Sequence, residues 1–160
     1  MNDLLMKVFT YRKARRFEDA KNVMKTLINK EPDHAIFQYQ MAWCYDNLGL
    51  ETEAVPHYEK AIQLGLPPKD LEGAYLGLGS TYRSIGRYVE AQNLFEEALL
   101  LFPDSEQIKV FYSMTLYNLK QYEKAMAVLL NTLVETTSDE SILQYKEAIV
   151  FYSDKLNQTW

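Results

Sequence analysis

The chain has 160 residues, 48% of them hydrophobic, and a formal net charge of -5. This length and composition can bury one apolar core, so the sequence predicts a single folded domain over residues 1–160. The longest apolar runs, 98–102 and 125–130, fall far short of the roughly 18 apolar residues that span a membrane. No stretch of signal-peptide composition accompanies the basic N-terminal residues, which predicts a cytoplasmic protein.

Charge is distributed unevenly along the chain. Residues 1–30 hold eight Lys and Arg against three Asp and Glu, a net charge of +5, whereas residues 31–160 hold nine against nineteen, a net charge of -10. An acidic partner, or the acidic end of a second copy, would complement the basic end. The alternative interpretation is that the protein has two differently solvated surfaces.

An alanine-centred phrase recurs along the chain, at Ala20, Ala54, Ala91 and Ala125, with spacings of 34, 37 and 34 residues. Each alanine is followed by a bulky residue four positions later and by a small or medium residue three positions after that. This spacing places the three side chains on one helical face, where small residues let a neighbouring helix approach closely. Repeated pairs of helices are therefore predicted.

Taken in chain order, the predicted elements are four helix-turn-helix repeats and a closing helix. The repeats occupy residues 1–34, 35–68, 72–105 and 106–139, and the closing helix occupies residues 140–156. In the second and third repeats, Gly49 and Gly86 are predicted to end the first helix of the pair. Three extra residues between these two repeats fall in a Gly- and Pro-containing loop, 65–69, where insertion costs little.

Helix starts are predicted from capping residues. Each of the last three repeats should begin after an N-cap that follows a proline; these residues are Asp33, Asp70 and Asp104. Thr137 and Glu140 have the spacing of a capping box for the closing helix. Pro56 is predicted to lie near the start of its helix, four residues after an N-cap at Thr52.

These repeats resemble the tetratricopeptide repeat, a helix-turn-helix unit of 34 residues. The third repeat carries the family signature most completely, through Tyr75, Leu78, Gly79, Tyr82, Gly86, Ala91, Phe95, Ala98 and Pro103. The resemblance implies an all-α solenoid, a right-handed superhelix of four helix pairs that the closing helix caps. The first and fourth repeats depart from the signature, with Arg15 and Lys120 in place of the turn glycine, as terminal repeats commonly do.

Three phrases, 45–49, 78–83 and 86–88, are similar to those of one small bacterial family of tetratricopeptide proteins. That resemblance covers residues 35–150 and implies protein–protein contacts, a dimer and no enzymatic activity, with the partner unnamed. Tyr145 and Phe151, together with Tyr152, are predicted to be exposed on the last helix and to offer a dimer contact. The alternative is that these aromatic side chains seal the fourth repeat.

Residues suited to catalysis or metal binding are few. Two histidines and one cysteine fall short of a structural zinc set, and His57 has no nucleophile at a motif spacing. Cys44 is predicted to be a small packing residue. Glycines at 73, 77 and 79 superficially suggest a phosphate loop, but no strand precedes them, so they are predicted to pack helices. The sequence therefore predicts no catalytic residues, no cofactor and no metal.

In the repeat architecture that this sequence resembles, the first helix of each pair lines a concave groove. The residues predicted to bind a protein or peptide there are Tyr39, Trp43, Asp46, Asn47, Leu76, Ser80, Arg83, Met114, Tyr117 and Asn118. The same face begins in the first repeat with Leu5, Phe9, Arg12 and Lys13.

Two alternatives remain for this face and its partner. The groove is filled either by an external partner or by the chain's own ninth helix or a second copy, so that the protein would be a self-associating structural protein. Nucleic acid is the other class of partner, because the segment 11–17 interleaves cations with Tyr11 and Phe17. Both aromatic residues, however, are repeat core positions, and the acidic remainder of the chain argues against a phosphate-tracking groove.

Overall fold

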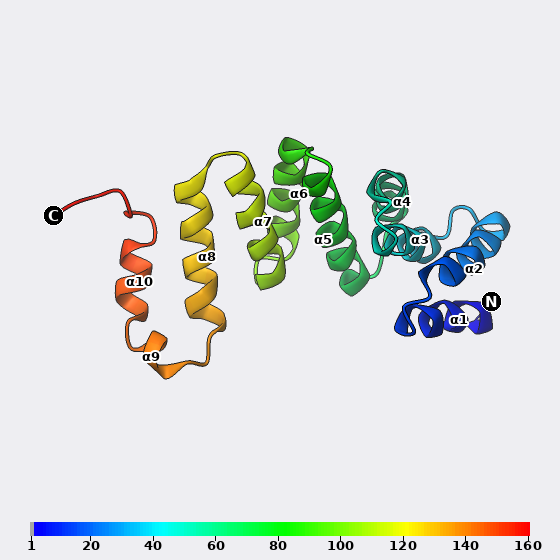
Figure 1. Ribbon diagram of the computed structural model, residues 1–160, viewed down its shortest axis with the longest axis horizontal. Helices are drawn as coiled ribbons and strands as arrows, with labels where there is room; N and C mark the ends of the chain where they lie inside the picture. Colours follow the sequence, from blue (N-terminus) through cyan, green and yellow to red (C-terminus); the bar gives the residue numbers. More distant parts are fainter. Residues whose placement is uncertain (1) are drawn as a thin grey trace. The chain divides into compact units, whose positions relative to one another are not determined.

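The computed structural model describes residues 2–160 and the side chains of residues 3–160. Every regular element in that range is a helix, which confirms the all-α prediction (Figure 1). The elements are α1 (Asn2–Lys13), α2 (Phe17–Lys30), α3 (Ala35–Asn47), α4 (Glu51–Leu64), α5 (Pro68–Ser84), α6 (Tyr88–Leu101), α7 (Glu106–Asn118), α8 (Tyr122–Thr136), α9 (Glu140–Leu143) and α10 (Lys146–Tyr152). Within the described residues, none of these helices is both long enough and apolar enough to cross a membrane.

The helices are organised in two compact units, Met1–Gly86 with α1 to α5 and Arg87–Trp160 with α6 to α10. In the first unit each helix packs against the next one along the chain, and in the second unit α6 packs on α7, α7 on α8 and α10 on α8. Each described repeat boundary within a unit is therefore a helix–helix contact, as stacking of repeats requires. The prediction that residues 1–160 behave as one domain stays a prediction.

The alanine-centred phrase forms the buried face of the second helix in each pair. Ala20, Ala54 and Ala91 are completely buried, and so are the bulky residues four positions after them, Met24, Tyr58 and Phe95, to within about one per cent. In the fourth repeat Ala125 is buried, but the corresponding bulky residue, Leu129, is 41% exposed. The face that a following repeat would cover is thus only partly covered at α8.

The turn inside each pair uses a left-handed backbone conformation. Gly49 and Gly86 have φ values of 70° and 82°, as predicted, and Arg15 and Lys120 adopt 57° and 61° at the two equivalent positions. At α3–α4 the amide of Leu50 donates to the Tyr45 carbonyl at 3.0 Å, which is the bond that closes a Schellman motif. The same bond recurs in the first and fourth pairs, so the non-glycine turns keep the geometry of the glycine ones.

The predicted N-caps are wrong by one to three residues. The N-cap positions are His34, Pro67 and Ser105, and none of the three makes a side-chain capping bond. Asp33 instead forms an exposed ion pair with Lys60 at 2.8 Å. Asp70 lies inside the first turn of α5, where a carboxylate faces the positive end of the helix dipole. Proline supplies the start of α5 because its fixed φ suits the first helical position.

Pro56 lies further inside its helix than predicted. The helix α4 begins at Glu51 with Leu50 as the N-cap, so Pro56 is the sixth helical residue. At that position the missing amide proton leaves the Thr52 carbonyl without its helical partner. The side chain of Pro56 is exposed, so the ring adds little to the core.

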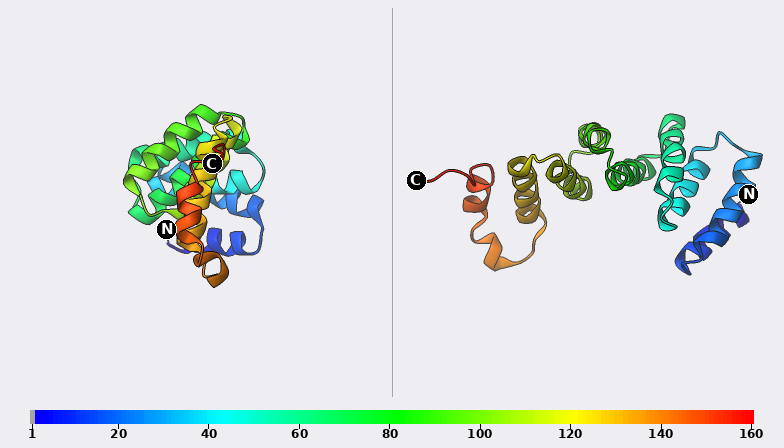
Figure 2. Two further views of the ribbon diagram at one scale, coloured as in Figure 1. Left: turned by 90° about the vertical axis from the view of Figure 1, so that its left-hand side faces the viewer. Right: turned by 45° about the horizontal axis from the view of Figure 1, so that its top comes forward.

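The predicted closing helix over 140–156 is also wrong, because it is broken in two. The helix α9 ends at Leu143 and α10 begins at Lys146, and both are short. The predicted capping box of Thr137 and Glu140 does not form, since Asp139 is the N-cap and its carboxylate accepts a 2.8 Å bond from the Ser141 amide. Figures 1 and 2 show α10 returning alongside α8 in the opposite direction. The end of the chain therefore covers α8 with one short helix.

Candidate partner-binding surface

The residues predicted to bind a partner are all accessible to some degree. In the first unit, Trp43, Leu76, Ser80 and Arg83 are half-buried and Asn47 is exposed. In the second unit, Met114 and Tyr117 of α7 are exposed and Asn118 is half-buried. These positions therefore lie on the surface of the first helices of their pairs.

Part of the predicted set is used inside the protein. The Asp46 carboxylate accepts bonds from the Tyr58 hydroxyl at 2.6 Å and the Thr81 hydroxyl at 2.9 Å, joining α3 to α4 and α5. Burial raises the pKa of Asp46, and these two bonds oppose the rise. The amide of Asn47 donates to the Trp43 carbonyl of its own helix at 2.8 Å. Asp46 is therefore a structural link between helices.

Two glycines allow α5 to approach the helices beneath it. A Cβ at Gly77 would lie 2.5 to 2.8 Å from atoms of the Tyr58 ring and hydroxyl, and one at Gly73 would collide with the Tyr39 hydroxyl. The prediction that these glycines pack helices is confirmed. Tyr39 is consequently held between α3 and α5, with its ring centroid 6.1 Å from that of Tyr58.

The first unit has a hollow of about 380 Å³ between α1 and α3. It is lined by Met6, Phe9, Thr10, Arg12, Lys13 and Trp43. The Arg12 guanidinium stacks on the Trp43 ring at 3.2 Å from the centroid, and Arg12 Nη1 donates to the Gln40 side-chain oxygen. Trp43 thus forms one wall of the hollow, and the cation held against it belongs to the first repeat.

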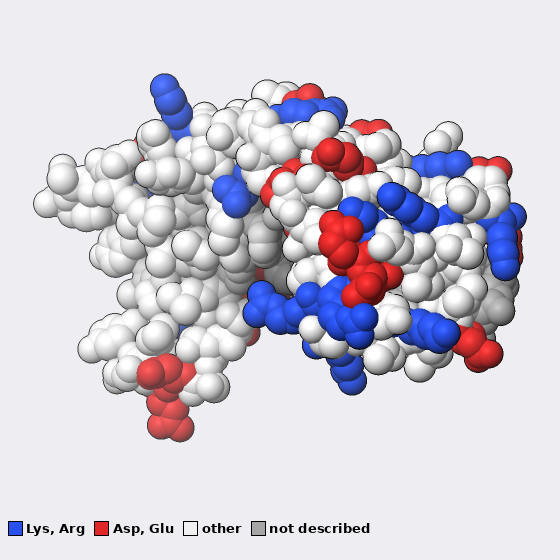
Figure 3. All heavy atoms as spheres, turned by 45° about the vertical axis from the view of Figure 1, so that its right-hand side comes forward, with Lys and Arg blue, Asp and Glu red and all other residues white. Residues whose placement is uncertain are grey.

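The positive charge of Arg12 in this hollow is partly removed from water. Burial lowers the pKa of the Arg12 guanidinium, and its Nε is buried without a hydrogen-bond partner. Among the described residues, no carboxylate forms an ion pair with Arg12 or Lys13. Figure 3 shows basic side chains gathered over the part of the surface built by the N-terminal helices.

A second, smaller hollow of about 220 Å³ lies on the same unit, lined by Asp46, Glu51, Ser80, Thr81 and Ser84. It brings together the predicted residues Asp46 and Ser80. The Thr81 hydroxyl is bonded to Asp46 and to the Gly77 carbonyl, and the Ser84 hydroxyl donates to the Thr81 carbonyl at 2.8 Å. The Thr81 and Ser84 hydroxyl groups therefore donate within the protein, which leaves the Ser80 hydroxyl and the Glu51 carboxylate as the polar groups that this hollow presents.

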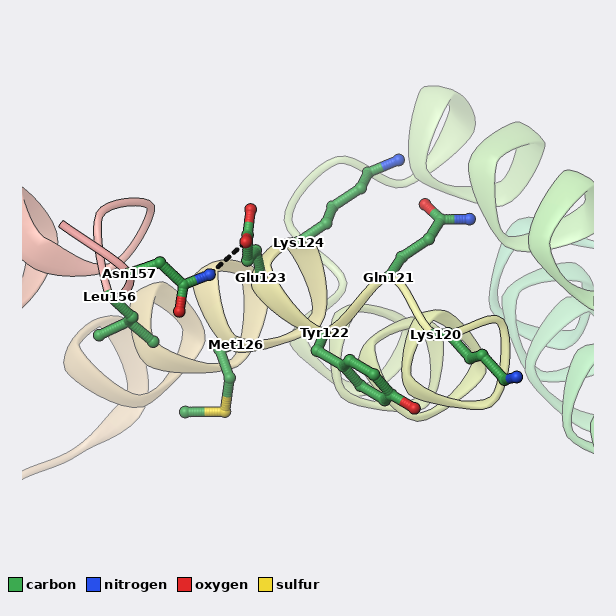
Figure 4. A pocket seen from close by; sticks show the side chains of 8 residues that line it. All are labelled: Lys120, Gln121, Tyr122, Glu123, Lys124, Met126, Leu156 and Asn157. Atoms are coloured by element: carbon green, nitrogen blue, oxygen red, sulfur yellow. Dashed lines mark hydrogen bonds between the residues drawn. The ribbon is translucent and has the colours of Figure 1, made fainter.

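The second unit has a larger hollow, of about 590 Å³, at the start of α8 (Figure 4). It is lined by Lys120, Gln121, Tyr122, Glu123, Lys124, Met126, Leu156 and Asn157. The Asn157 amide donates to the Glu123 carboxylate, which ties the C-terminal segment to α8. The Tyr122 ring meets the Tyr117 ring edge-on at 5.1 Å, so one predicted groove residue borders this hollow.

Large apolar side chains are exposed along the whole of α8. Tyr122, Met126, Leu129 and Leu133 recur at spacings of four, three and four residues, and each is 40 to 50% exposed. We call this set the α8 stripe. Figure 3 shows few charged side chains on the visible face of the C-terminal helices. The predicted exposure of Tyr145, Phe151 and Tyr152 is confirmed, although Tyr145 is the N-cap of α10 and not a residue of the last helix itself.

Two features of the surface were not predicted from the sequence. Met6 and Thr10 line the hollow beside Trp43, although the groove register placed Leu5 and Phe9 inward. The α8 stripe was also missed, because the alanine phrase placed one of its residues, Leu129, on the buried face and the other three were not considered together. The four-three-four spacing of its large apolar residues was the available signal.

Cys44 and His57, two residues of types often used in catalysis, are occupied structurally. Cys44 is fully buried, and burial raises the pKa of its thiol to about 11, which keeps it protonated and unreactive. The His57 Nδ1 donates to the Gln38 side-chain oxygen at 2.6 Å, and its ring stacks on Tyr45. Burial lowers the pKa of His57, with a further contribution from Lys60.

Two proteins of similar sequence carry the same name, Superkiller protein 3. The Superkiller protein 3 of Schizosaccharomyces pombe is 28% identical over 127 residues, which are 75% of this chain and 9% of that protein. The Superkiller protein 3 of Saccharomyces cerevisiae is 22% identical over 139 residues, 82% of this chain and 9% of that protein. The chain thus spans about a tenth of the length of these relatives.

Three solved structures share the fold at low sequence identity. A MamA double mutant superposes with a TM-score of 0.77 at 17% identity, covering 98% of this chain and 86% of that one. YrrB, described as a tetratricopeptide protein with an unusual peptide-binding site, gives 0.72 at 16% identity, covering 88% and 71%. Naa15/Naa10 bound to HypK gives 0.66 at 17% identity, covering 98% and 23%.

The family model described as tetratrico peptide repeat matches residues 33–156, more than three quarters of the chain. This range includes the second, third and fourth helix pairs and both short C-terminal helices. With its helix pairs, left-handed turns and alanine-centred packing, the chain belongs to the tetratricopeptide repeat family.

Proposed function

We propose that this chain is a non-enzymatic interaction module that binds a peptide segment of a partner protein on the face that the first helices of its pairs build in the first unit. The observation that carries the proposal is the hollow between α1 and α3, where Trp43 stands at a predicted groove position beside an accessible cavity. Tetratricopeptide repeats generally serve as protein-interaction scaffolds. The peptide-binding site described for YrrB gives a precedent within the same fold.

The chemistry of the hollow supports binding of a partner. Trp is the residue most enriched among binding hot spots, and here its ring is half-buried rather than absorbed into the core. Met6 and Phe9, exposed by 60% and 38%, add apolar contact area on the facing helix. A peptide that covers these side chains would remove them from water, which is the main source of binding free energy at such sites.

The test is binding of peptides selected from a random library displayed on phage, measured on the purified full chain by biolayer interferometry. Trp43→Ala is expected to weaken binding by about 1 to 3 kcal/mol, and Arg83→Ala by a similar amount. The matched control is Leu64→Ala, which truncates a partly exposed apolar residue on α4. Circular dichroism must show unchanged helicity. Equal losses for Trp43→Ala and Leu64→Ala would remove this face from consideration.

A second function, self-association, is favoured by the α8 stripe. A 4-3-4 spacing of apolar residues is the pattern with which helices pack against each other. The short helix α10 covers part of α8, held there by the Asn131 amide, which donates to the Ser153 hydroxyl at 3.2 Å. The stripe nevertheless stays 40 to 50% exposed, and an isolated protein rarely leaves so continuous an apolar row in water.

Charge supports pairing of the stripe with a second copy of itself. Lys120 lies two residues before the start of α8, whereas Glu135 and Glu140 lie near its other end, where Glu135 also forms an ion pair with Lys109 at 3.4 Å. If the two-fold axis is perpendicular to the helices, the two copies of α8 run antiparallel, so the lysine of each copy approaches the acidic end of the other. The paired stripes would then be flanked by opposite charges at both ends.

Light scattering coupled to size-exclusion chromatography tests this candidate. The wild-type chain is expected to be a dimer at micromolar concentration, and Leu129→Glu is expected to be a monomer because it places a carboxylate in the apolar contact. Leu100→Glu is the control, since Leu100 is 85% exposed on α6 and lies outside the stripe. A monomeric wild-type chain at high micromolar concentration would rule the dimer out.

A further inference from the structure

The hollow between α1 and α3 contains a cation, Arg12, for which the described part of the chain provides no anion. The Arg12 guanidinium is half-buried, donates to the neutral Gln40 side chain and stacks on the Trp43 ring. Its Nε has no hydrogen-bond partner, and the described residues supply it with no carboxylate. A partly desolvated charge of this kind is costly until an anion pairs with it.

A second cation stands at the edge of the same hollow, next to apolar side chains. Lys13 is exposed and follows Arg12 directly, and the described residues give it no ion pair. Met6 and Phe9 line the hollow from the same helix. The volume of about 380 Å³ is near the lower limit of ligand sites, and suits a few side chains of a ligand.

We infer that this hollow binds a peptide segment in which an Asp or Glu stands beside a large apolar residue. The carboxylate pairs with Lys13 and the Arg12 guanidinium, and supplies the missing anion. The apolar side chain packs on Trp43, Phe9 and Met6. This inference rests on the proposed function, because it specifies the chemistry of the peptide that the same face binds.

The arrangement of the other N-terminal cations favours a peptide over nucleic acid. Arg16 is paired with Asp19 at 2.7 Å and its guanidinium lies over the Tyr11 ring, 4.6 Å from the centroid. Arg15 occupies the left-handed turn after α1. Of the cations among the described residues, Arg12 and Lys13 alone line the hollow, whereas a nucleic acid strand requires a row of cations that follows successive phosphates.

The experiment begins with random dodecapeptides displayed on phage and selected on the full chain. The most enriched peptide is synthesised with fluorescein as the probe, together with a second probe whose acidic residues are replaced by their amides. Fluorescence anisotropy then measures the affinity of both probes for the wild-type chain, Arg12→Gln and Lys13→Glu. The control is Lys25→Glu, which reverses an exposed lysine on α2.

The expected result is an enriched motif with Asp or Glu next to Leu, Phe or Trp. Arg12→Gln and Lys13→Glu should each weaken the acidic probe at least about tenfold, while Lys25→Glu changes it less than about twofold. The amide probe should bind weakly to the wild-type chain. The Lys13→Glu variant should bind the amide probe no more weakly than the wild type does, because replacing the probe's carboxylate and replacing Lys13 remove the same interaction. Because Arg12 packs on Trp43, its replacement also changes the shape of the hollow. Lys13 is exposed, so the Lys13→Glu variant is the one that tests pairing with the ligand carboxylate.

Each contrary result has a distinct meaning. Peptides that require Trp43 but show no acidic preference overturn the acidic ligand and leave the proposed function standing. A library that yields no binder, or binders indifferent to Trp43→Ala, overturns both. A fluorescein-labelled oligouridine that displaces the probe from the wild-type chain and binds Lys13→Glu at least about tenfold more weakly assigns the hollow to nucleic acid instead.

Discussion

Two side chains adopt a backbone conformation that normally belongs to glycine. Arg15 and Lys120 have φ values near 60° at the turn of the first and fourth pairs, where the second and third pairs have Gly49 and Gly86. A Cβ in this region costs roughly 1 kcal/mol. The Schellman bonds from the Arg16 amide to the Tyr11 carbonyl and from the Gln121 amide to the Leu116 carbonyl hold the two residues there.

Lys120→Gly is therefore expected to stabilise the protein by about 0.5 to 1 kcal/mol, because the relief of strain exceeds the added entropy of the unfolded chain. Urea unfolding followed by circular dichroism measures the change. Gly49→Ala is the control in the opposite direction, and it should lower the free energy of unfolding by a similar amount. A Lys120→Gly variant less stable than the wild type would show that the lysine side chain contributes a contact that outweighs the strain.

His57 gives the folded protein a pH dependence. The Gln38 amide nitrogen donates to the Pro32 carbonyl at 2.6 Å, so its oxygen faces His57 and accepts from Nδ1. Burial lowers the pKa of His57 from its ordinary value of 6.5, so the unfolded chain binds the proton at higher pH than the folded protein. Stability contributed by the neutral ring is fully present above the unfolded pKa and falls as the pH drops through 6.5.

Unfolding free energies measured between pH 7.5 and pH 5.5 test this expectation. The wild type should lose stability over that interval, and His57→Gln should lose less, because a glutamine can still donate to Gln38 but cannot be protonated. His34→Gln serves as the control for removal of a histidine. Parallel curves for the wild type and His57→Gln would contradict the assigned role of the half-buried ring.

The sequence predicted which small residues pack helices, and it did not predict what they pack against. Gly77 follows Tyr58 by nineteen positions, and only the fold brings the missing Cβ against that ring. Asp46 illustrates the converse, because a carboxylate at a groove position suggested a partner contact. In the structure the Tyr58 and Thr81 hydroxyls bind it, and no spacing in the sequence shows that both would reach it.

At the scale of elements, the repeat period predicted the four helix pairs but not the residues at which each helix begins and ends. The pairs follow from the alanine phrases and the turn positions, whose physical requirements are local. The N-caps at His34, Pro67 and Ser105 were missed because aspartate after proline is only one of several ways to start a helix. The closing helix broke at Gln144 and Tyr145 for a tertiary reason, since α10 packs on α8.

Pro56 is the element-scale feature with the clearest energetic consequence. As the sixth residue of α4 it removes the bond to the Thr52 carbonyl, and its exposed ring makes little contact in return. Pro56→Ala should stabilise the protein by about 1 to 3 kcal/mol in thermal or urea unfolding. Pro68→Ala is the matched control and should give little gain, because Pro68 is the first residue of α5. Equal gains for both would refute the positional argument.

At the scale of the whole molecule, the remaining prediction is that residues 1–160 unfold as one domain. In repeat proteins stability is shared between neighbouring repeats, since each pair buries its apolar face against the next. Within each of the two compact units this is observed, because α2 packs on α3 and α4 on α5 in the first, and α6 packs on α7 in the second. If the coupling extends across all four repeats, a change in one unit must alter the unfolding of the other.

A fluorescent probe in the first unit and a destabilising substitution in the second unit make this test possible. Trp43 is half-buried in the first unit, and Trp160, which is 81% exposed, can be replaced by phenylalanine so that fluorescence reports on Trp43 alone. Leu116→Ala, at a fully buried position in the second unit, should cost about 2 to 5 kcal/mol. In a single domain the urea midpoint seen by Trp43 fluorescence falls together with that seen by circular dichroism. A Trp43 transition that stays in place while the helicity unfolds in two steps would divide the chain into two domains at residues 86 and 87.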